Sequence, residues 1–198
     1  MKKVNFYFDF ISPYTYLAST QLAALSTEHG VIFEWLPVNL PKLMKQAGNV
    51  SPVSIKSKAI YSLRDLKRWA TYLDVPFKLI RPGSFDSRPA LRIAGALQGE
   101  DRSVFCMAVF EALWSGSVDP TQDDWLVTLF ENAQLPKAWL ALTSDDLEQY
   151  TEKALKAGVF GVPTFILHGK GRPEMFFGID HMDFLARACE SSGSIAAT

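Results

Sequence analysis

The chain has 198 residues, of which 48% are hydrophobic and 13% are aromatic. This apolar content is enough for a large buried core, so it excludes an intrinsically disordered chain. The net charge of −1 leaves no basic excess and argues against a nucleic acid as the partner. The length fits one large domain, or one domain that carries an insertion.

The N-terminal segment shows no pattern of export or of membrane insertion. Lys2 and Lys3 match the charged start of a signal peptide, but Asp9 and Pro13 interrupt the apolar stretch that follows them. No segment approaches the ~18 consecutive apolar residues that a membrane-spanning helix needs. We therefore expect a cytoplasmic protein that has no membrane partner.

The first 38 residues predict a strand, a helix and a second strand. Residues 3–9 are rich in β-branched and aromatic side chains and end close to a proline, as strands do. Residues 14–29 suit one helix, with leucines spaced for a single buried face and Gly30 at its end. Residues 31–38 suit another strand. This order is typical of a βαβ unit whose two strands are parallel.

Helices dominate the middle of the chain. Residues 39–56 carry several turn-forming residues and predict a loop. The apolar spacing then predicts helices at 57–74, 88–98, 101–114, 121–132 and 144–157. Two strands (160–169 and 174–178), a helix (181–191) and a frayed tail complete the pattern. The predicted fold class is α/β, with a block of helices inserted into a β-sheet domain.

Charge is distributed unevenly along the chain. Residues 41–70 contain seven bases and the single acid Asp65, whereas residues 119–152 contain eight acids and the single base Lys137. Most of each block suits a solvated helix face. The basic segment also suits the binding of an anionic small molecule. Its bases are Lys42, Lys45, Lys56, Lys58, Arg64, Lys67 and Arg68.

The two cysteines, Cys106 and Cys189, lie far apart in apolar, helical surroundings. They form no CxxC motif, and no metal-ligand spacing can be built from them. We expect both to be small core residues of a protein in a reducing compartment, and we expect no metal site.

Ser12 stands between the first strand and the first helix, directly before Pro13. A serine at this place suits a helix N-cap. Its hydroxyl could instead donate to an anion, such as a thiolate, at the helix N-terminus. A serine nucleophile is disfavoured, because none of the histidines (His29, His168 and His181) stands in a motif that would supply its base. The cap and the anion-binding role both stay open.

The segment Gly161-Val162-Pro163-Thr164 places a proline at the start of a strand. Because proline has no N–H, it belongs at a sheet edge or beside a ligand. If the peptide bond before Pro163 is cis, the backbone groups of Val162 turn outward and can pair with a peptide-like ligand. A proline that merely starts a strand is the alternative.

Residues 3 to about 190 together resemble the thioredoxin fold of the DsbA-like group, in which a helical domain is inserted. The resemblance is closest to 2-hydroxychromene-2-carboxylate isomerases and the related kappa-class glutathione transferases. It implies a thioredoxin-like domain of residues 1–40 and 158–198 and a helical insertion domain of residues 41–157. It rests on FYFDFISPYTYLAS (6–19), GNVSP (48–52), KAIYSLRDLKRWA (58–70), FDSRPALR (85–92), GVFGVPTF (158–165) and FFGIDH (176–181).

Oxidoreductases of the DsbA-like group carry CxxC where this chain has Ser12-Pro13-Tyr14-Thr15. Without cysteines at this place, dithiol–disulfide exchange is excluded. The resemblance implies instead that Ser12 hydrogen-bonds the sulfur of glutathione and favours its thiolate. The cofactor-binding residues that it implies are Ser12, Asn49, Lys58, Val162, Pro163 and Asp180.

Each of these residues has an implied partner on glutathione. Val162 would pair through its backbone with the cysteinyl group, and Asp180 would hold the γ-glutamyl ammonium. Asn49 and Lys58 would reach the glycyl carboxylate or the substrate. Relatives often carry serine or asparagine before this aspartate and arginine after it. This chain has isoleucine and histidine there, which implies one polar contact fewer with the γ-glutamyl end.

The resemblance implies a homodimeric isomerase of aromatic catabolism. It would interconvert 2-hydroxychromene-2-carboxylate and trans-o-hydroxybenzylidenepyruvate by reversible addition of a thiolate to a conjugated double bond. Two alternatives stay open: conjugation of glutathione to electrophiles, and non-catalytic binding of a thiol or peptide. The candidates for binding the small aromatic carboxylate substrate are Tyr14, Tyr61, Arg64, Arg68 and Trp69.

Overall fold

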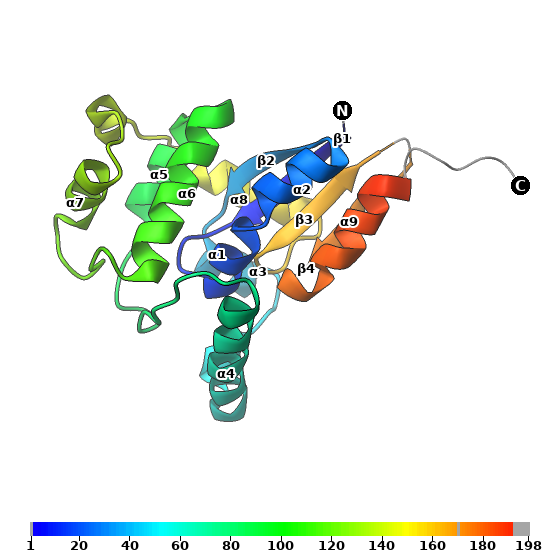
Figure 1. The fold of residues 1–198 in the computed structure, drawn as a ribbon, viewed down its shortest axis with the longest axis horizontal. Coiled ribbons are helices and arrows are strands. Elements are labelled where there is room, and N and C mark those ends of the chain that lie inside the picture. Colours follow the sequence, from blue (N-terminus) through cyan, green and yellow to red (C-terminus); the bar gives the residue numbers. More distant parts are fainter. Residues whose placement is uncertain (1, 170, 192–198) are drawn as a thin grey trace, which may run out of the picture.

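A four-stranded sheet forms the centre of the protein, and helices cover both of its faces (Figure 1). The structure is a computed structural model that describes residues 2–169 and 171–191. The strands lie in the order β2-β1-β3-β4, with β1 parallel to β2 and β3 antiparallel to both of its neighbours. They are β1 (Lys2–Phe8), β2 (Val31–Pro37), β3 (Thr164–His168) and β4 (Glu174–Phe177). The predicted α/β class and the parallel βαβ unit are confirmed.

Nine α-helices and three short 3-10 helices are found within the described residues. The α-helices are α1 (Pro13–Ser19), α2 (Leu22–His29), α3 (Leu40–Gln46), α4 (Lys56–Tyr72), α5 (Arg88–Ala96), α6 (Gly99–Ser115), α7 (Trp125–Asn132), α8 (Leu147–Lys156) and α9 (Met182–Ser191). The 3-10 helices are η1 (Pro52–Ser54), η2 (Lys137–Ala141) and η3 (Ile179–His181). Most of the predicted frayed tail lies outside the described residues.

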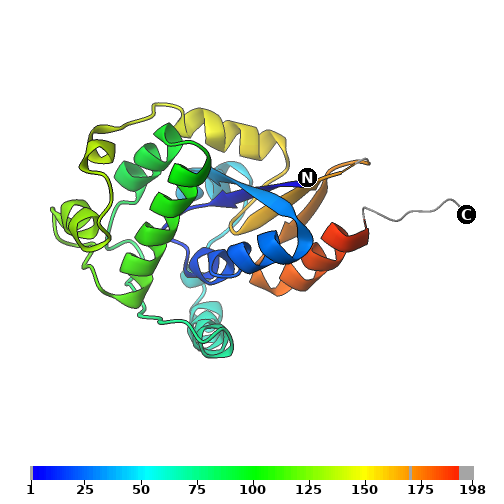
Figure 2. The same ribbon diagram turned by 45° about the horizontal axis from the view of Figure 1, so that its top comes forward.

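The alternation of side chains along β1 separates two hydrophobic clusters. Phe6 is fully buried in the larger cluster, where its ring stacks on Phe165 at 5.0 Å between centroids and meets Trp35 edge-on at 4.9 Å. Tyr7 points to the opposite face and packs in the smaller cluster with Ile166. Helices α1, α2, α6 and α9 cover the face of Phe6, whereas α3 and α8 cover the face of Tyr7 (Figures 1 and 2).

Arg102 connects the inserted helices to the sheet. It lies on α6, is 4% exposed, and donates to the carbonyls of Leu97 at 2.8 Å, Trp35 at 2.8 Å and Gly95 at 3.2 Å. Two of these carbonyls lie at the C-terminal end of α5, where the helix dipole favours a cation. The guanidinium therefore joins α5 and α6 to strand β2.

Two sequence predictions are corrected by the structure. The helix predicted over 14–29 is two helices, because the hydroxyls of Ser19 and Thr20 donate to carbonyls of the preceding turn, at 2.7 and 2.8 Å, where the chain bends. The loop predicted over 39–56 contains α3 and η1. Asn39 caps α3 by accepting from the N–H of Lys42 at 3.2 Å, and the neighbouring Pro41 starts the helix rather than preventing it.

The predicted burial of Cys106 and Cys189 is confirmed, and both thiols are free. Burial raises the pKa of each thiol above its ordinary value. Among the described helices, none is long and apolar enough to cross a bilayer.

Candidate active site

Ser12 is the N-cap of α1, as one of its two sequence interpretations predicts. Its Oγ accepts a 3.2 Å hydrogen bond from the N–H of Thr15, and the residue is 6% exposed. The cap uses a lone pair of the hydroxyl oxygen and leaves the hydroxyl proton available. Capping and donation to an anion are therefore compatible roles for the same side chain.

The turn that carries Ser12 is held by Asp9 at the end of β1. The N–H of Ser12 donates to the backbone carbonyl of Asp9 at 3.1 Å, and the N–H of Ile11 donates to Asp9 Oδ1 at 3.2 Å. Sequence reasoning missed Asp9 as a site residue. The signal available in the sequence was an acid at the end of an otherwise apolar strand.

The Val162-Pro163 peptide bond is cis. Two hydrogen bonds hold the loop around it: Thr164 Oγ1 donates to the carbonyl of Gly161 at 2.7 Å, and the N–H of Gly178 donates to the carbonyl of Pro163 at 2.9 Å. The residues that the structure describes provide no hydrogen-bond partner for the backbone of Val162. This backbone is therefore available to an extended ligand.

Asn49 comes from the loop after α3 and lies beside the proline loop. Its Nδ2 donates to the carbonyl of Phe160 at 2.9 Å. At Gly161, an added Cβ would lie 3.0 Å from the ring of Phe177 and 3.5 Å from Asn49 Nδ2, so the backbone and these two side chains approach closely. The structure thus brings together two predicted residues, Asn49 and Val162, from distant parts of the chain.

Asp180 lies in η3, which packs beside α1. Its carboxylate is 68% exposed, with Oδ1 3.5 Å from His181 Nδ1. The preceding Gly178 has a φ of +91°, and a Cβ there would lie 2.3 Å from Asp180 Oδ1. Glycine is therefore required for Asp180 to hold this position. Since Gly178 also donates to Pro163, Asp180 is connected to the proline loop.

Tyr14 connects α1 to α4. Its hydroxyl donates to Asp65 Oδ2 at 3.0 Å. Burial of the ring and the nearby carboxylate of Asp65 raise the pKa of Tyr14 to about 12. The ring of Tyr14, which is predicted to bind the substrate, is half-buried. The hydrogen bond to Asp65 fixes it between α1 and α4.

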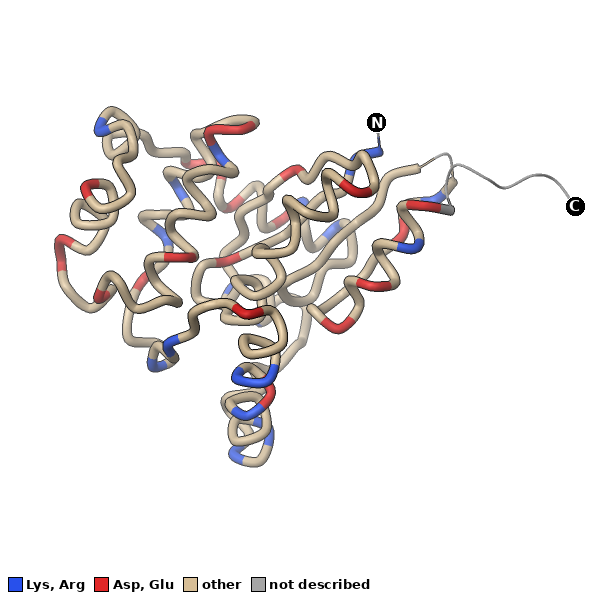
Figure 3. Tube along the Cα trace, viewed as in Figure 1, with Lys and Arg blue, Asp and Glu red and all other residues tan. Residues whose placement is uncertain are grey.

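The remaining predicted residues lie along α4, which projects from the rest of the molecule and is rich in basic side chains (Figure 3). Lys58, Tyr61 and Arg68 are three or four residues apart along a line through Asp65, the partner of Tyr14, and all three are exposed. Arg64 lies on an adjoining, exposed side of the helix. Trp69 is half-buried against the larger hydrophobic cluster.

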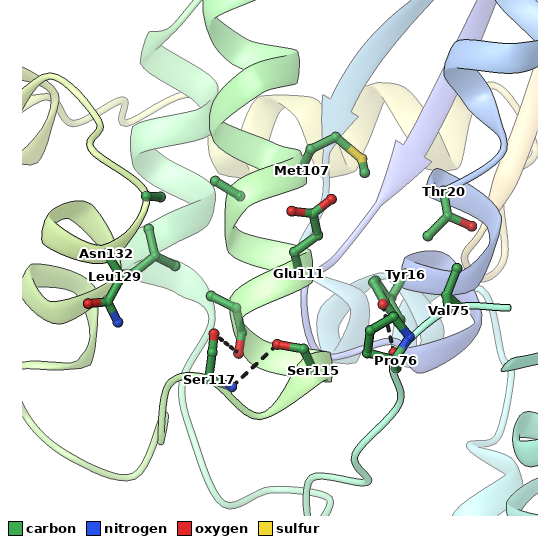
Figure 4. A pocket seen from close by; sticks show the side chains of 13 residues that line it. Tyr16, Thr20, Val75, Pro76, Met107, Glu111, Ser115, Ser117, Leu129 and Asn132 are labelled. Carbon is green, nitrogen blue, oxygen red and sulfur yellow. Dashed lines mark hydrogen bonds between the residues drawn. The ribbon is translucent and has the colours of Figure 1, made fainter.

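Two cavities are lined by residues other than those predicted to bind glutathione or the substrate. One has a volume of about 220 Å³ and borders the Ser12 turn, with Asp9, Ile11, Asn39, Pro41, Phe85, Asp86, Ser87 and Arg88 around it. The other has a volume of about 500 Å³ and lies between α1, α6 and α7 (Figure 4). Its lining includes Tyr16, Met107 and Glu111 and none of the residues predicted to bind glutathione or the substrate.

Comparisons with known proteins show the family to which the fold belongs. The family model of the DSBA-like thioredoxin domain matches residues 3–190. A 2-hydroxychromene-2-carboxylate isomerase of Sphingobium xenophagum is 30% identical in an alignment that covers 93% of this chain and 96% of the relative. Glutathione S-transferase kappa 1 of Caenorhabditis elegans is 28% identical, with coverages of 94% and 90%. A solved 2-hydroxychromene-2-carboxylate isomerase superposes with a TM-score of 0.80 at 27% identity, covering 98% of this chain and 100% of that chain.

Proposed function

Because this chain belongs to the 2-hydroxychromene-2-carboxylate isomerases within the DSBA-like thioredoxin domain family, we propose that it is a glutathione-dependent cis–trans isomerase. Its substrate is a small aromatic carboxylate, and the reaction interconverts 2-hydroxychromene-2-carboxylate and trans-o-hydroxybenzylidenepyruvate. The relatives named as isomerases support the reaction class. The proposal places the protein in the cytoplasm, as a homodimer that serves aromatic catabolism.

The residues around Ser12 fit glutathione in two respects. The hydroxyl of Ser12 keeps its proton while it caps α1, and the backbone of Val162 has no hydrogen-bond partner among the described residues. A thiol peptide needs both a donor for its sulfur and a backbone to pair with. Bound glutathione supplies a thiolate, which can add reversibly to a conjugated double bond and so permit rotation about it.

The chain's own residues hold and activate the thiol. Ser12 donates to the sulfur and favours its charged form, because a hydrogen bond to an anion stabilises that anion. Val162 pairs with the cysteinyl backbone beside Pro163. The exposed carboxylate of Asp180 holds the ammonium of the γ-glutamyl group. Asn49 and Lys58 reach the glycyl carboxylate or the substrate.

The substrate is held between the thiol and α4. Three of the five bases of α4, Lys58, Arg64 and Arg68, attract the substrate carboxylate, and no acid other than Asp65 lies on this helix. The rings of Tyr14, Tyr61 and Trp69 provide an apolar surface for the aromatic part. Tyr14 and Asp65 fix this helix at the N-terminus of α1.

The available proton of the buried Ser12 hydroxyl is the observation that carries the proposal, and a difference titration tests it. Glutathione is added to the protein at neutral pH while ultraviolet thiolate absorbance is followed. We expect a saturable thiolate signal that is lost in Ser12→Ala. The protein's own thiols are buried and have raised pKa values, so they contribute little at this pH.

Ser19→Ala is the matched control for this titration. Ser19 is also a buried serine of α1, but its hydroxyl donates to the carbonyl of Tyr16 near the other end of the helix. The thiolate signal should persist in this variant. A signal that is equal in the wild type and in Ser12→Ala would exclude the role of Ser12.

A second candidate function is conjugation of glutathione to electrophiles, which the similarity to kappa-class transferases favours. Both functions use the same thiolate, and they differ in its fate. Isomerisation regenerates glutathione, whereas conjugation consumes it stoichiometrically. Measuring free glutathione during turnover therefore distinguishes them. Binding of glutathione without turnover of either kind would indicate a non-catalytic binding protein.

A further inference from the structure

Asp9 is a buried acid that the proposed reaction does not use. It is 1% exposed and lies three residues before Ser12. Its carboxylate accepts three hydrogen bonds: from Ile11 N–H at 3.2 Å, from Leu40 N–H at 2.9 Å and from Ser87 Oγ at 2.7 Å. These donors lie in the Ser12 turn, at the start of α3 and directly before α5. One carboxylate therefore joins three segments around Ser12.

The surroundings of Asp9 contain few other charges. Asp86 and Arg88 border the same 220 Å³ cavity and form an ion pair with each other at 2.6 Å. On the α3 side, Lys42 pairs with Glu148 rather than with Asp9. Burial raises the pKa of Asp9 to about 6 despite the three donors, and the charge of Asp86 adds to the rise. Asp9 is thus the buried group near Ser12 that changes its charge close to neutral pH.

We propose that Asp9 is a positioning residue for Ser12, whose carboxylate holds the Ser12 turn against α3 and α5 and releases it when protonated. An ionised carboxylate only accepts hydrogen bonds and so matches its three donors. A neutral carboxyl carries a proton on one of its lone-pair sites and accepts more weakly than a carboxylate, because a hydrogen bond to an ionised acceptor is about twice as strong. At least one of the three hydrogen bonds is then weakened. Loss of the bond to Ile11 loosens the turn that sets the direction of the Ser12 hydroxyl.

The functional meaning of this inference rests on the proposed function, because Ser12 is taken to act on the glutathione sulfur. The role of Asp9 in holding the Ser12 turn does not depend on glutathione. The amide of Thr15 donates both to Ser12 Oγ at 3.2 Å and to the Ser12 carbonyl at 3.1 Å, so its protection from hydrogen exchange reports on the position of Ser12. A charge that acted only through space would leave this protection unchanged.

The test measures the protection factor of the Thr15 amide by NMR between pH 5 and 8. In the wild type we expect the factor to fall about fivefold to tenfold below a midpoint near pH 6, as loss of a hydrogen bond implies. In Ser87→Ala the charged form of Asp9 loses a donor, so the midpoint should rise by about one pH unit. In Asp9→Asn the transition should be absent.

Ser84→Ala is the matched control, because Ser84 lies in the same loop and its buried hydroxyl has no partner among the described residues. The pH midpoint of Thr15 protection in Ser84→Ala should equal that of the wild type. If Asp9→Asn does not fold, Ser87→Ala still decides the question. A protection factor that is constant across this range, or a midpoint that is the same in the wild type and Ser87→Ala, would overturn the positioning role.

A glutathione titration over the same range separates this inference from the proposed function. Thiolate binding that decreases at the pH where the protection of Thr15 decreases supports both. If Thr15 protection follows Asp9 but glutathione does not bind at any pH, the positioning role stands and the proposed function fails. Thiolate binding combined with constant Thr15 protection leaves the proposed function intact and contradicts the role of Asp9.

Discussion

The hydroxyl of Tyr14 donates a 3.0 Å hydrogen bond to Asp65 across the contact between α1 and α4. Asp65 is the single acid of α4, and Tyr14 is the second residue after Ser12. The bond therefore fixes the position of the basic helix relative to the candidate thiol site. Without it, a helix that projects from the body of the protein (Figure 1) would have fewer constraints.

Tyr14→Phe should lower the free energy of unfolding by about 1 kcal/mol, the net value of one hydrogen bond. The substitution keeps the ring and removes only the donor, so the packing of α1 is retained. Urea unfolding measures the change. Tyr72→Phe is the control, because Tyr72 is 79% exposed at the end of α4, the helix that carries Asp65. Equal stability of the two variants would show that the bond between Tyr14 and Asp65 contributes nothing.

Arg64 and Arg68 should differ in their effect on the substrate. Arg68 follows Asp65, the partner of Tyr14, by three residues and lies on the same line along α4, whereas Arg64 lies on an adjoining side. Arg68→Gln should raise the KM for the aromatic carboxylate about fivefold, as loss of one exposed ionic contact of about 1 kcal/mol implies. Arg64→Gln should raise it less than about twofold. Steady-state kinetics at low ionic strength measures both, and a larger effect at Arg64 would reverse this assignment.

Gly178→Ala should weaken glutathione binding about tenfold, which corresponds to about 1.4 kcal/mol. The position has a φ of +91°, and the new methyl group would lie 2.3 Å from Asp180 Oδ1, so the carboxylate must move. Isothermal titration calorimetry measures the dissociation constant. Gly171→Ala is the control, since nothing lies within 4 Å of a Cβ added there. Unchanged affinity in Gly178→Ala would contradict the role proposed for Asp180.

Local patterns predicted the sheet well and the helix boundaries less well. The aromatic strand at residues 3–9 and the strand after Pro163 carry their signals within a few residues, and both are found as β1 and β3. Leu17 and Leu22 are five residues apart, a step that turns about 140° around an ideal helix, so the spacing carried a sign of the bend that the prediction of one helix overlooked. Pro41 suggests a loop when it is considered alone, and marks a helix start only once Asn39 is seen to cap α3.

Two features of the candidate site, the N-cap at Ser12 and the cis peptide bond before Pro163, depend on short motifs. Ser12 before Pro13, and Val162 before Pro163, could both be found because each motif is local. The surroundings of Asp9 could not be predicted in this way, because Leu40 and Ser87 are 31 and 78 residues away in the sequence. Only the tertiary fold shows that these two donors meet one carboxylate. The same holds for Tyr14 and Asp65, which are 51 residues apart.

Asp9 should also make the stability of the protein depend on pH in a defined direction. Its pKa is about 6 in the folded protein and 3.8 as the ordinary value, so between these values the folded state binds the additional proton. The resulting stabilisation is fully present below pH 3.8 and is lost as the pH rises through about 6. Asp9 alone should therefore make the free energy of unfolding about 2 kcal/mol larger at pH 4.5 than at pH 7.

Urea unfolding of the wild type and of Asp9→Asn at these two pH values isolates this contribution, because all other carboxyl groups are common to both proteins. The difference between pH 4.5 and pH 7 should be about 2 kcal/mol smaller in Asp9→Asn. Ser87→Ala should increase the difference by about 1 kcal/mol, since removing a donor raises the pKa of Asp9 further, and Ser84→Ala should leave it unchanged. An uncharged side chain at position 9 would therefore give a more stable protein near neutral pH. Because the charge of Asp9 does not increase stability there, its position beside Ser12 is the simpler explanation for the presence of a carboxylate. Equal differences in the wild type and Asp9→Asn would show that Asp9 does not titrate between pH 4.5 and 7, and this explanation would then fail.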